Sequence, residues 1–336
     1  MTLRLALLSY WHVHAKDYER EAGANPDSQV TVVWDENPAR GIENAERIGA
    51  RFVADFDAVL ADPEIDGVIV TTATSEHHRV IIAAAKAGKH IFTEKVIAAT
   101  TAEVDDVLAA VDAAGVIMTV CLPRISNGYT QAIKAILDSG ELGDIHYSRV
   151  RVGHDGALPT EANPNGWLPP QFFEPSEAQG GALLDFGAHP LYLSQYFLGT
   201  PAQVSSQYGY VTGRALDDHA VVTLGYANGA IAVGEVSFLD NPGVFEIELH
   251  GTKGSLRYAV PDGILRQRQG SATRERTGWE EVANVPADLP SPFDQWVDRV
   301  KSGKTAPENL ALARALTVLA EASERSAKEK CSISID

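Results

Sequence analysis

The feature that most constrains the fold is a regular alternation of short apolar strands with helical stretches in the first third of the chain. Five segments have the apolar run expected of a buried strand: Leu3–Leu8, Val30–Trp34, Gly67–Thr71, His90–Thr93 and Val116–Val120. Helical spacing fills the intervals between the last three, notably Val80–Ala87 and Ala102–Ala113. This alternation predicts βαβ units and a parallel, doubly wound sheet.

The character of the sequence changes after Arg124. A helix is expected at Tyr129–Asp138, and closing helices at Pro292–Gly303 and Asn309–Ala327. Strand-like runs lie between them: Ile145–Val152, Val204–Val211, His219–Tyr226, Ala230–Phe238, Phe245–His250 and Ser255–Val260. Asn228-Gly229 is a hairpin-turn signal, and residues 159–179 are expected to form a long surface loop. We therefore expect an α/β protein with a doubly wound domain over residues 1–122 and an α+β domain over residues 123–336, its sheet mainly antiparallel.

Composition excludes several classes of partner. A formal net charge of −17 argues against nucleic acid, because phosphate binding needs a basic face. Cys121 and Cys331 are too few for a disulfide framework, which favours a reducing compartment. No signal peptide fits the first residues, and no apolar run approaches the length of a membrane span. We expect a cytoplasmic protein that binds neither nucleic acid nor membrane.

Two segments carry residues suited to chemistry. Glu94 and Lys95 put an acid and an amine at the end of the fourth strand. Asp185 and His189 lie four residues apart, on one face if their segment is helical. A lysine, an aspartate and a histidine brought together can polarise a hydroxyl and remove its proton. An alcohol dehydrogenase needs such a set of side chains, together with a hydride acceptor.

The place expected for a dinucleotide is unusual. In doubly wound sheets the first strand-to-helix turn binds the pyrophosphate, and glycines let the backbone approach it. Here the turn reads Ser9-Tyr10-Trp11-His12-Val13-His14, so other residues occupy all three glycine positions. Asp35 ends the second strand, where a carboxylate accepts bonds from a ribose diol; the alternative is that it caps the helix opened by Pro38.

His12 and His14 also have two interpretations. Either histidine is a loop or packing residue, or His12 serves as a phosphate donor. We expect no metal site, because the sequence places no third ligand beside this His-x-His pair.

Several blocks in order resemble the glucose–fructose oxidoreductase / inositol dehydrogenase / MocA family of NAD(P)-dependent oxidoreductases. The blocks are 87–90 followed by Glu94-Lys95, then 139–143, 180–189, 250–255 and 293–297. The resemblance covers almost the whole chain. It implies an N-terminal Rossmann domain and a C-terminal domain with a large open sheet that often forms the subunit interface, hence a homodimer or homotetramer.

Position by position, the resemblance assigns Lys95 to the family's Glu-Lys-Pro motif and Asp185 and His189 to its Asp-x-x-x-His pair. Val96 stands where the family has proline. The cofactor-binding residues implied by the turn, by Asp35 and by the resemblance are Ser9, Trp11, His12, Asp35, Thr72, Thr74, His77, Glu94 and Lys95. The substrate-binding candidates are Lys95, Arg124, His154, Trp167, Asp185, His189 and Tyr192.

The expected roles follow from side-chain chemistry. His189 is the general base, because imidazole titrates near neutral pH. Asp185 orients it or binds a second substrate hydroxyl, and Lys95 bonds the reacting oxygen. The alternatives are a helix cap and a packing histidine for Asp185 and His189, and a surface ion pair for Lys95 with Glu94.

We therefore expect an NAD(P)-dependent dehydrogenase acting on the CH–OH groups of a sugar, cyclitol or related polyol. NAD is preferred, since Asp35 would bond its 2′-hydroxyl and repel the 2′-phosphate of NADP, although Arg40 leaves NADP open. Two other functions stay open. One is an NAD-dependent glycosidase or lyase that transiently oxidises its sugar, and the other is a non-catalytic nucleotide- or sugar-binding protein.

Overall fold

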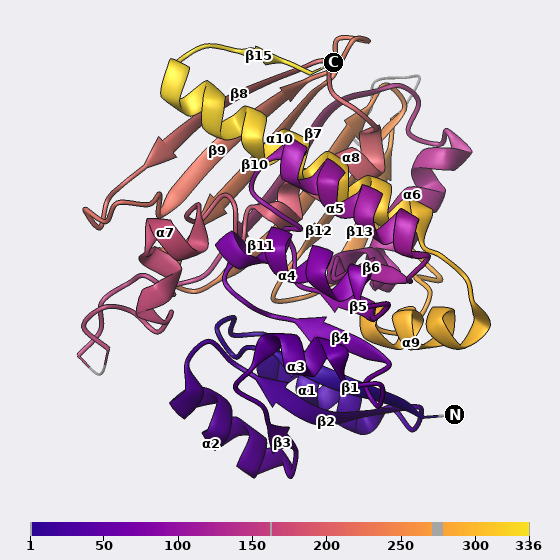
Figure 1. Cartoon of the computed structure of the whole chain (residues 1–336). Helices are drawn as coiled ribbons and strands as arrows, with labels where there is room; N and C mark the ends of the chain where they lie inside the picture. The colour runs from indigo at the N-terminus through magenta and orange to yellow at the C-terminus, as the bar shows by residue number, and fades with distance from the viewer. Residues whose placement is uncertain (1, 162, 271–277, 336) are drawn as a thin grey trace. The chain divides into compact units, whose positions relative to one another are not determined.

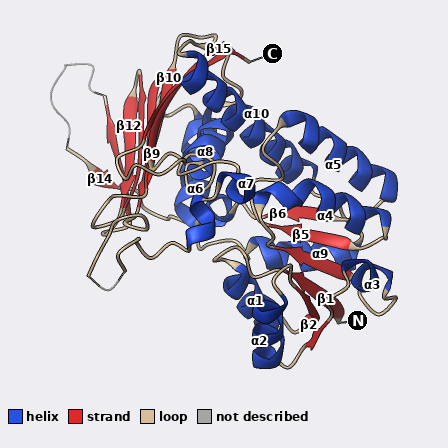
Figure 2. Cartoon of the chain, turned by 60° about the vertical axis from the view of Figure 1, so that its left-hand side comes forward, coloured by secondary structure: helices blue, strands red, loops and turns tan. Residues whose placement is uncertain are grey.

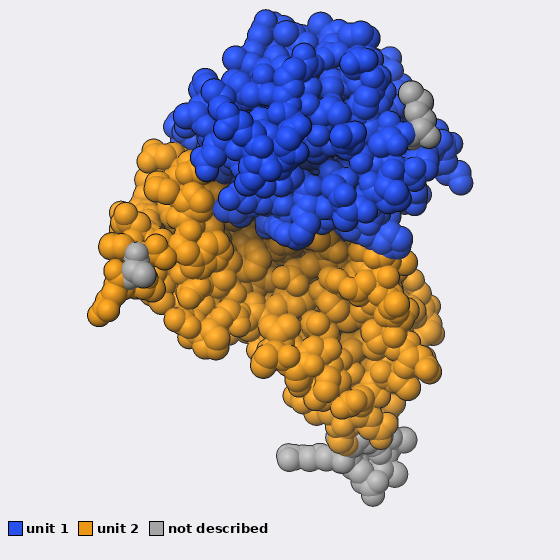
Figure 3. All heavy atoms as spheres, turned by 90° about the horizontal axis from the view of Figure 1, so that it is seen from below, with its two compact units in different colours: residues 1–122, 176–179, 290–317 blue, residues 123–175, 180–289, 318–336 orange. Residues whose placement is uncertain are grey.

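The computed structural model describes residues 2–161, 163–270 and 278–335. The chain divides into two compact units (Figure 3). Unit 1 comprises residues 1–122, 176–179 and 290–317, and unit 2 comprises residues 123–175, 180–289 and 318–336.

Unit 1 contains a six-stranded parallel sheet of order β3-β2-β1-β4-β5-β6 (Figure 1). Its strands are β1 (Leu3–Leu8), β2 (Ser28–Trp34), β3 (Arg51–Phe52), β4 (Gly67–Val70), β5 (His90–Thr93) and β6 (Met118–Val120). The chain order reverses between β1 and β4. The carboxyl ends of these two strands are therefore where a doubly wound sheet binds its ligand.

Helices connect these strands and complete the core of unit 1. They are α1 (Ala15–Ala24), α2 (Pro38–Ile48), α3 (Phe56–Ala61), α4 (Thr74–Lys86), α5 (Thr101–Ala114) and α9 (Pro292–Ser302). The β4 residues are all buried, as expected where helices cover both faces of a parallel sheet. Phe92 of β5 packs against Phe293 and Trp296 of α9, so the late segment of the chain completes an early core.

Unit 2 contains a nine-stranded sheet of order β14-β13-β12-β11-β7-β10-β9-β8-β15. Its strands are β7 (Ile145–Gly153), β8 (Gln203–Gly209), β9 (His219–Gly225), β10 (Ile231–Ser237), β11 (Val244–Gly251), β12 (Gly254–Ala259), β13 (Ile264–Gln269), β14 (Glu280–Glu281) and β15 (Ile333–Ser334). Within the described residues, β7 and β10 run parallel and the other neighbours antiparallel. The fold class predicted from sequence is confirmed.

The helical segments of unit 2 lie on one side of this sheet. Figure 2 shows α6 (Gly128–Ser139) and α8 (Ala188–Leu198) on the same side, and α8 contacts β7 and β10. Ser148, Val150 and Val152 of β7 are buried, whereas Arg149 and Arg151 are partly exposed. The strand alternation thus gives the sheet a helix-covered face and an open face.

The remaining segments are short, apart from α10. They are η1 (Pro123–Ser126), η2 (Pro170–Phe173), α7 (Pro175–Ala178) and α10 (Pro307–Glu329). The expected long loop at 159–179 therefore contains two helical turns. No helix among the described residues has the length and apolar character needed to span a membrane.

Candidate functional site

Hydrogen bonds hold the turn after β1, where other residues stand at the glycine positions of a dinucleotide-binding turn. Ser9 adopts the left-handed region at φ 79°, and its N–H donates to the Trp34 carbonyl at 2.6 Å. The Ser9 hydroxyl donates to Glu36 Oε1 at 2.9 Å and accepts the Trp11 N–H at 3.0 Å. Trp11 is buried, and its indole N–H donates to Glu177 of α7. Ser9 and Trp11, two of the predicted cofactor residues in this turn, therefore have protein partners.

Asp35 is buried at the end of β2 and fixes two turns. Its carboxylate accepts the N–H groups of Tyr10 and Asn37, each at 2.8 Å. The Arg40 guanidinium adds bonds at 2.8–3.2 Å. The alternative role for Asp35 as the α2 cap is wrong, because the Asn37 side chain caps that helix by accepting the Arg40 N–H.

Glu36 is an acid at this position that sequence reasoning missed. It follows Asp35 directly, and its side chain is 38% exposed whereas that of Asp35 is 0% exposed. Its Oε1 accepts bonds from Ser9 and Arg40. Its only sequence signal is its adjacency to Asp35 at the end of β2.

The end of β4 offers groups suited to a nucleotide. Thr72 is buried, and its Oγ1 has no hydrogen-bond partner within the described residues. Thr74 begins α4, whose N-terminus has no side-chain cap. An unpartnered buried hydroxyl and an uncapped helix N-terminus at the switch point fit the polar groups of a dinucleotide.

His77 of α4 lies with its ring between two backbone carbonyl groups. Its Nδ1 lies 2.7 Å from the Val96 carbonyl oxygen and its Nε2 lies 3.1 Å from that of Thr72. Burial lowers the pKa of this ring. The neutral ring donates to one of these two carbonyl oxygens and lies between the end of β4 and the segment that follows Lys95, where the Lys95–Val96 peptide bond is cis.

Glu94 and Lys95 form a buried pair just after β5. Lys95 Nζ lies 3.5 Å from Glu94 Oε1, and their side chains are 3% and 1% exposed, so the predicted alternative of a surface ion pair is wrong. Tyr18 donates its hydroxyl to Glu94. Burial alone would raise the pKa of Glu94, but the charges of His12, His14 and Lys95 outweigh it and hold that pKa well below its usual range.

Asp185 and His189 belong to unit 2, and their local structure differs from the predicted helix. Asp185 lies in a turn before α8 begins, and its N–H donates to the Gly181 carbonyl at 3.1 Å. His189 is the second residue of α8. The two side chains therefore do not share the face of one helix. The Gly-rich sequence bends the chain before the helix starts, which four-residue spacing cannot reveal.

His189 is buried and has a defined partner in Tyr192. Its Nδ1 lies 2.8 Å from the Tyr192 hydroxyl oxygen, which accepts the Arg124 N–H at 3.2 Å. If Nδ1–H donates to this oxygen, Nε2 keeps the lone pair that a general base needs. The Arg124 guanidinium instead lies 3.7 Å over the Phe245 ring.

Asp217 holds the turn that carries Asp185, and nothing in the sequence singled it out. Its carboxylate accepts the N–H groups of Gly181 at 3.0 Å and Leu183 at 2.8 Å. A Cβ on Gly181 would lie 2.1 Å from the Asp217 carbonyl oxygen, so only glycine fits there. Burial raises the pKa of Asp217 to about 6.

An aromatic cluster of unit 2 brings together other predicted substrate residues. The His154 ring stacks on Phe238 with a centroid distance of 4.9 Å, and lies 4.9 Å from Trp167 and 4.7 Å from Phe186. Phe186 meets His189 edge-on at 5.3 Å. Trp167 is 49% exposed, and its indole N–H donates to Asp155. The cluster thus runs from an exposed indole to the predicted base.

Comparison with known proteins places the chain in a family. The description "Oxidoreductase family, NAD-binding Rossmann fold" matches residues 10–122, and "GFO/IDH/MocA C-terminal domain" matches residues 130–257. The chain is 31% identical to scyllo-inositol 2-dehydrogenase (NAD(+)) of Bacillus subtilis, over 76% of this chain and 71% of that protein. The chain belongs to the Gfo/Idh/MocA oxidoreductase family.

Further members agree in length and fold. Myo-inositol 2-dehydrogenase of Thermotoga maritima is 26% identical over 92% of each chain. The solved structure of levoglucosan dehydrogenase in complex with NADH and levoglucosan has a TM-score of 0.82 and 21% identity, covering 100% of this chain and 99% of that one. The predicted family resemblance is confirmed, and with it a Gfo/Idh/MocA oxidoreductase whose Rossmann fold binds NAD.

Proposed function

We propose that the protein is an NAD-dependent dehydrogenase that oxidises a CH–OH group of a sugar, cyclitol or related polyol, or reduces the corresponding ketone. The observation that carries the proposal is the buried Lys95 ammonium beside Glu94 at the carboxyl end of β5. A buried cation at the ligand-binding end of a Rossmann sheet is placed to stabilise an oxygen that gains negative charge. The polyol class is supported by relatives that are named inositol 2-dehydrogenases.

We assign cofactor binding to unit 1. NAD accepts the hydride when it is bound. Thr72 and the uncapped start of α4 at Thr74 bond its polar groups, and the Ser9–Trp11 turn with His12 faces the pyrophosphate. Glu36 or Asp35 accepts the ribose hydroxyl, and His77 braces the strand ends around them.

We assign substrate chemistry to Lys95, Asp185 and His189. Lys95 donates a hydrogen bond to the reacting oxygen, and His189 accepts the hydroxyl proton through Nε2. Asp185 orients the substrate through a second hydroxyl. Tyr192 holds the His189 ring at Nδ1, and its hydroxyl is in turn fixed by the Arg124 N–H.

The aromatic cluster supports a cyclic substrate. Trp167, His154 and Phe186 present ring faces and edges that pack against the C–H face of a sugar or cyclitol, while hydroxyl groups need polar partners. An exposed indole at the outer end gives the substrate its first contact.

The experiment is a screen of free sugars, cyclitols and polyols with NAD, read as NADH absorbance. Net NADH formation with a free polyol supports the dehydrogenase. Release of an aglycone from a glycoside without net NADH would favour the glycosidase or lyase. Binding of NADH, followed by tryptophan fluorescence, without turnover of either kind would favour the non-catalytic function.

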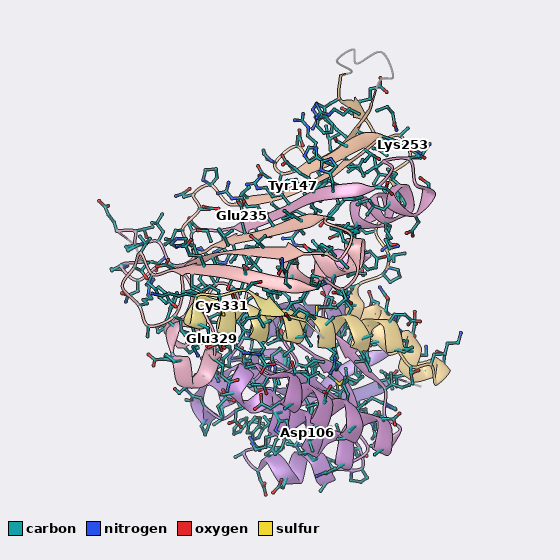
Figure 4. All side chains as sticks on the ribbon, turned by 90° about the horizontal axis from the view of Figure 1, so that it is seen from above. Asp106, Tyr147, Glu235, Lys253, Glu329 and Cys331 are labelled. Carbon is teal, nitrogen blue, oxygen red and sulfur yellow. The ribbon has the colours of Figure 1, made fainter. Side chains whose placement is uncertain are left out.

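We also propose that the protein is a cytoplasmic homodimer or homotetramer that associates through the open face of the unit 2 sheet. Tyr147 of β7 and Glu235 of β10, labelled in Figure 4, lie on neighbouring strands of that sheet. Arg149 bonds Glu235 at 2.8 Å and Glu246 at 3.0 Å on the same face. Val221 and Ile231 are 44% and 45% exposed there, so apolar side chains alternate with paired charges.

A further inference from the structure

Two histidines and a glutamate of unit 1 come together where the β1–α1 turn meets the end of β5. His12, His14 and Glu94 each offer a ligand-type atom, and these atoms lie within 4.8 Å of one another. His14 Nδ1 is 3.4 Å from Glu94 Oε2, and His12 Nε2 is 4.0 Å from Oε1. Glu94 is the third ligand that the sequence did not place beside the His-x-His pair, so the reason for expecting no metal site is removed.

The donor set matches the preferences of first-row divalent metals. Two imidazoles and one carboxylate bind catalytic zinc and non-haem iron in proteins. Metal–ligand bonds of about 2.0–2.2 Å at tetrahedral angles place ligand atoms about 3.3–3.6 Å apart. His14 Nδ1 and Glu94 Oε2, at 3.4 Å, already have this spacing, and the His12 ring must move inward from 4.0 Å to reach it.

The three ligands are unevenly buried, which indicates the kind of site. The side chains of Glu94 and His12 are 1% and 6% exposed, whereas that of His14 is 40% exposed. An ion can therefore enter from the His14 side and keep coordination positions open there. Catalytic zinc sites have this arrangement, and structural zinc sites are closed by four protein ligands.

Two neighbouring contacts set the chemical conditions of binding. His12 Nδ1 accepts the His14 N–H at 3.2 Å, so coordination through Nε2 moves the ring proton to Nδ1 and gives up this long hydrogen bond. Lys95 Nζ lies 3.5 Å from Glu94 Oε1 and shares that carboxylate with the ion. A buried dication beside an ammonium is stable only with a further anion, which the open positions can take as an oxygen ligand.

We propose that His12 Nε2, His14 Nδ1 and the Glu94 carboxylate bind one divalent transition-metal ion of the Zn²⁺ class, with the remaining positions open to an oxygen ligand. All three ligands lie in unit 1. Binding of the ion alone requires neither NAD nor a polyol, so its test is independent of the proposed dehydrogenase activity.

The test uses the full chain, made metal-free by dialysis against a chelator. Co²⁺ is titrated in without NAD or substrate, its visible absorption is recorded, and Zn²⁺ is then added as competitor. The expected result is saturation at one Co²⁺ per chain and loss of the absorption on adding Zn²⁺. Failure of the metal-free wild type to bind Co²⁺ stoichiometrically at micromolar concentration overturns the proposal.

Variants locate the ion. His12→Ala, His14→Ala and Glu94→Gln each should weaken Co²⁺ binding at least about 100-fold, more than loss of an outer partner of a ligand costs. His78→Ala is the matched control, since this histidine lies in the same unit, 3.5 Å from Asp106, and should bind Co²⁺ as the wild type does. Thermal unfolding of each metal-free variant checks the fold. If the His12 or Glu94 variant fails to fold, the His14→Ala variant still tests the site, because His14 is partly exposed. Wild-type Co²⁺ affinity in His14→Ala contradicts the site.

Discussion

We expect cofactor choice to depend on three side chains near the end of β2: Asp35, Glu36 and Arg40. The Arg40 guanidinium, which as a free group would accommodate a 2′-phosphate, is bound to Asp35 and contacts Glu36. Two carboxylates therefore face one cation, and a further anion is disfavoured there. The pairing of Arg40 with these two carboxylates is a second reason, besides the charge of Asp35, to expect a preference for NAD.

We predict that NADH binds at least about 10-fold more tightly than NADPH, because the 2′-phosphate meets uncompensated carboxylate charge. Glu36→Gln should reduce this ratio by improving NADPH binding, whereas Glu43→Gln on the exposed face of α2 should leave it unchanged. Dissociation constants from tryptophan fluorescence give the ratio. Tighter binding of NADPH to the wild type would refute the assignment.

The Tyr192 hydroxyl is expected to set the protonation of His189. Tyr192→Phe leaves the buried His189 Nδ1 and the Arg124 N–H without this acceptor. The imidazolium that forms as His189 takes the proton would lack this hydrogen bond, and a loss of about 1–3 kcal/mol in the transition state corresponds to a fall in kcat of about 5- to 150-fold. KM for NAD should not change, because Tyr192 belongs to unit 2. An unaltered kcat with a confirmed substrate would show that the contact is only packing.

At the scale of elements, the sequence predicted the strands that bury apolar runs and missed the short or polar ones. β1 and β5 have the predicted bounds, since their apolar residues are buried in the parallel sheet. β13 has the sequence ILRQRQ, and β15 has only two residues, so neither has an apolar period to detect. Asp185 lies in a turn before α8 and not on the same helix as His189, because the bend there depends on Asp217, which is far away in sequence.

The turn over residues 180–187 should respond to pH through Asp217. Its pKa is raised from 3.8 to about 6 by burial, so the folded chain holds this proton more tightly than the unfolded chain. The stabilisation is full below about pH 4 and is lost as pH rises through about 6, a change of about 3 kcal/mol.

Asp217→Asn removes this titration. The free energy of unfolding of the wild type, relative to Asp217→Asn, should therefore fall by about 2.5 kcal/mol between pH 4 and pH 7. Urea unfolding at both pH values measures it, with the exposed Asp144→Asn as control. A difference that is the same at both pH values would mean that Asp217 does not titrate as described.

For the whole molecule, the order of several sequence blocks pointed to the family. The predicted chemistry is divided between two units. Lys95 belongs to unit 1, and Asp185 and His189 belong to unit 2. Sequence blocks named the site residues but not the groups that hold them, such as Asp217 for the turn of Asp185 and Glu177 for Trp11. Those partners are single polar residues without a motif, and only the folded chain brings them to their places.

The proposed association through the unit 2 sheet is open to a direct test. Ile231→Asp puts a charge on the exposed face of β10 and should convert the wild-type oligomer to a smaller species, because an unpaired charge is costly in an interface. Ile42→Asp, at 43% exposure on α2, is the matched control and should leave the mass unchanged. Light scattering after size exclusion gives the masses. A monomeric wild type, or an Ile231→Asp variant of wild-type mass, would contradict this surface.

We propose that Lys95 and His189 serve one hydride-transfer reaction. The most direct measurement is kcat of Lys95→Met and His189→Ala for a polyol that the wild type oxidises with NAD. Each variant should lose about 100- to 10,000-fold in kcat, the range for a positioned proton-transfer group, while NADH binding to His189→Ala stays at the wild-type level. Wild-type turnover by both variants would contradict the account.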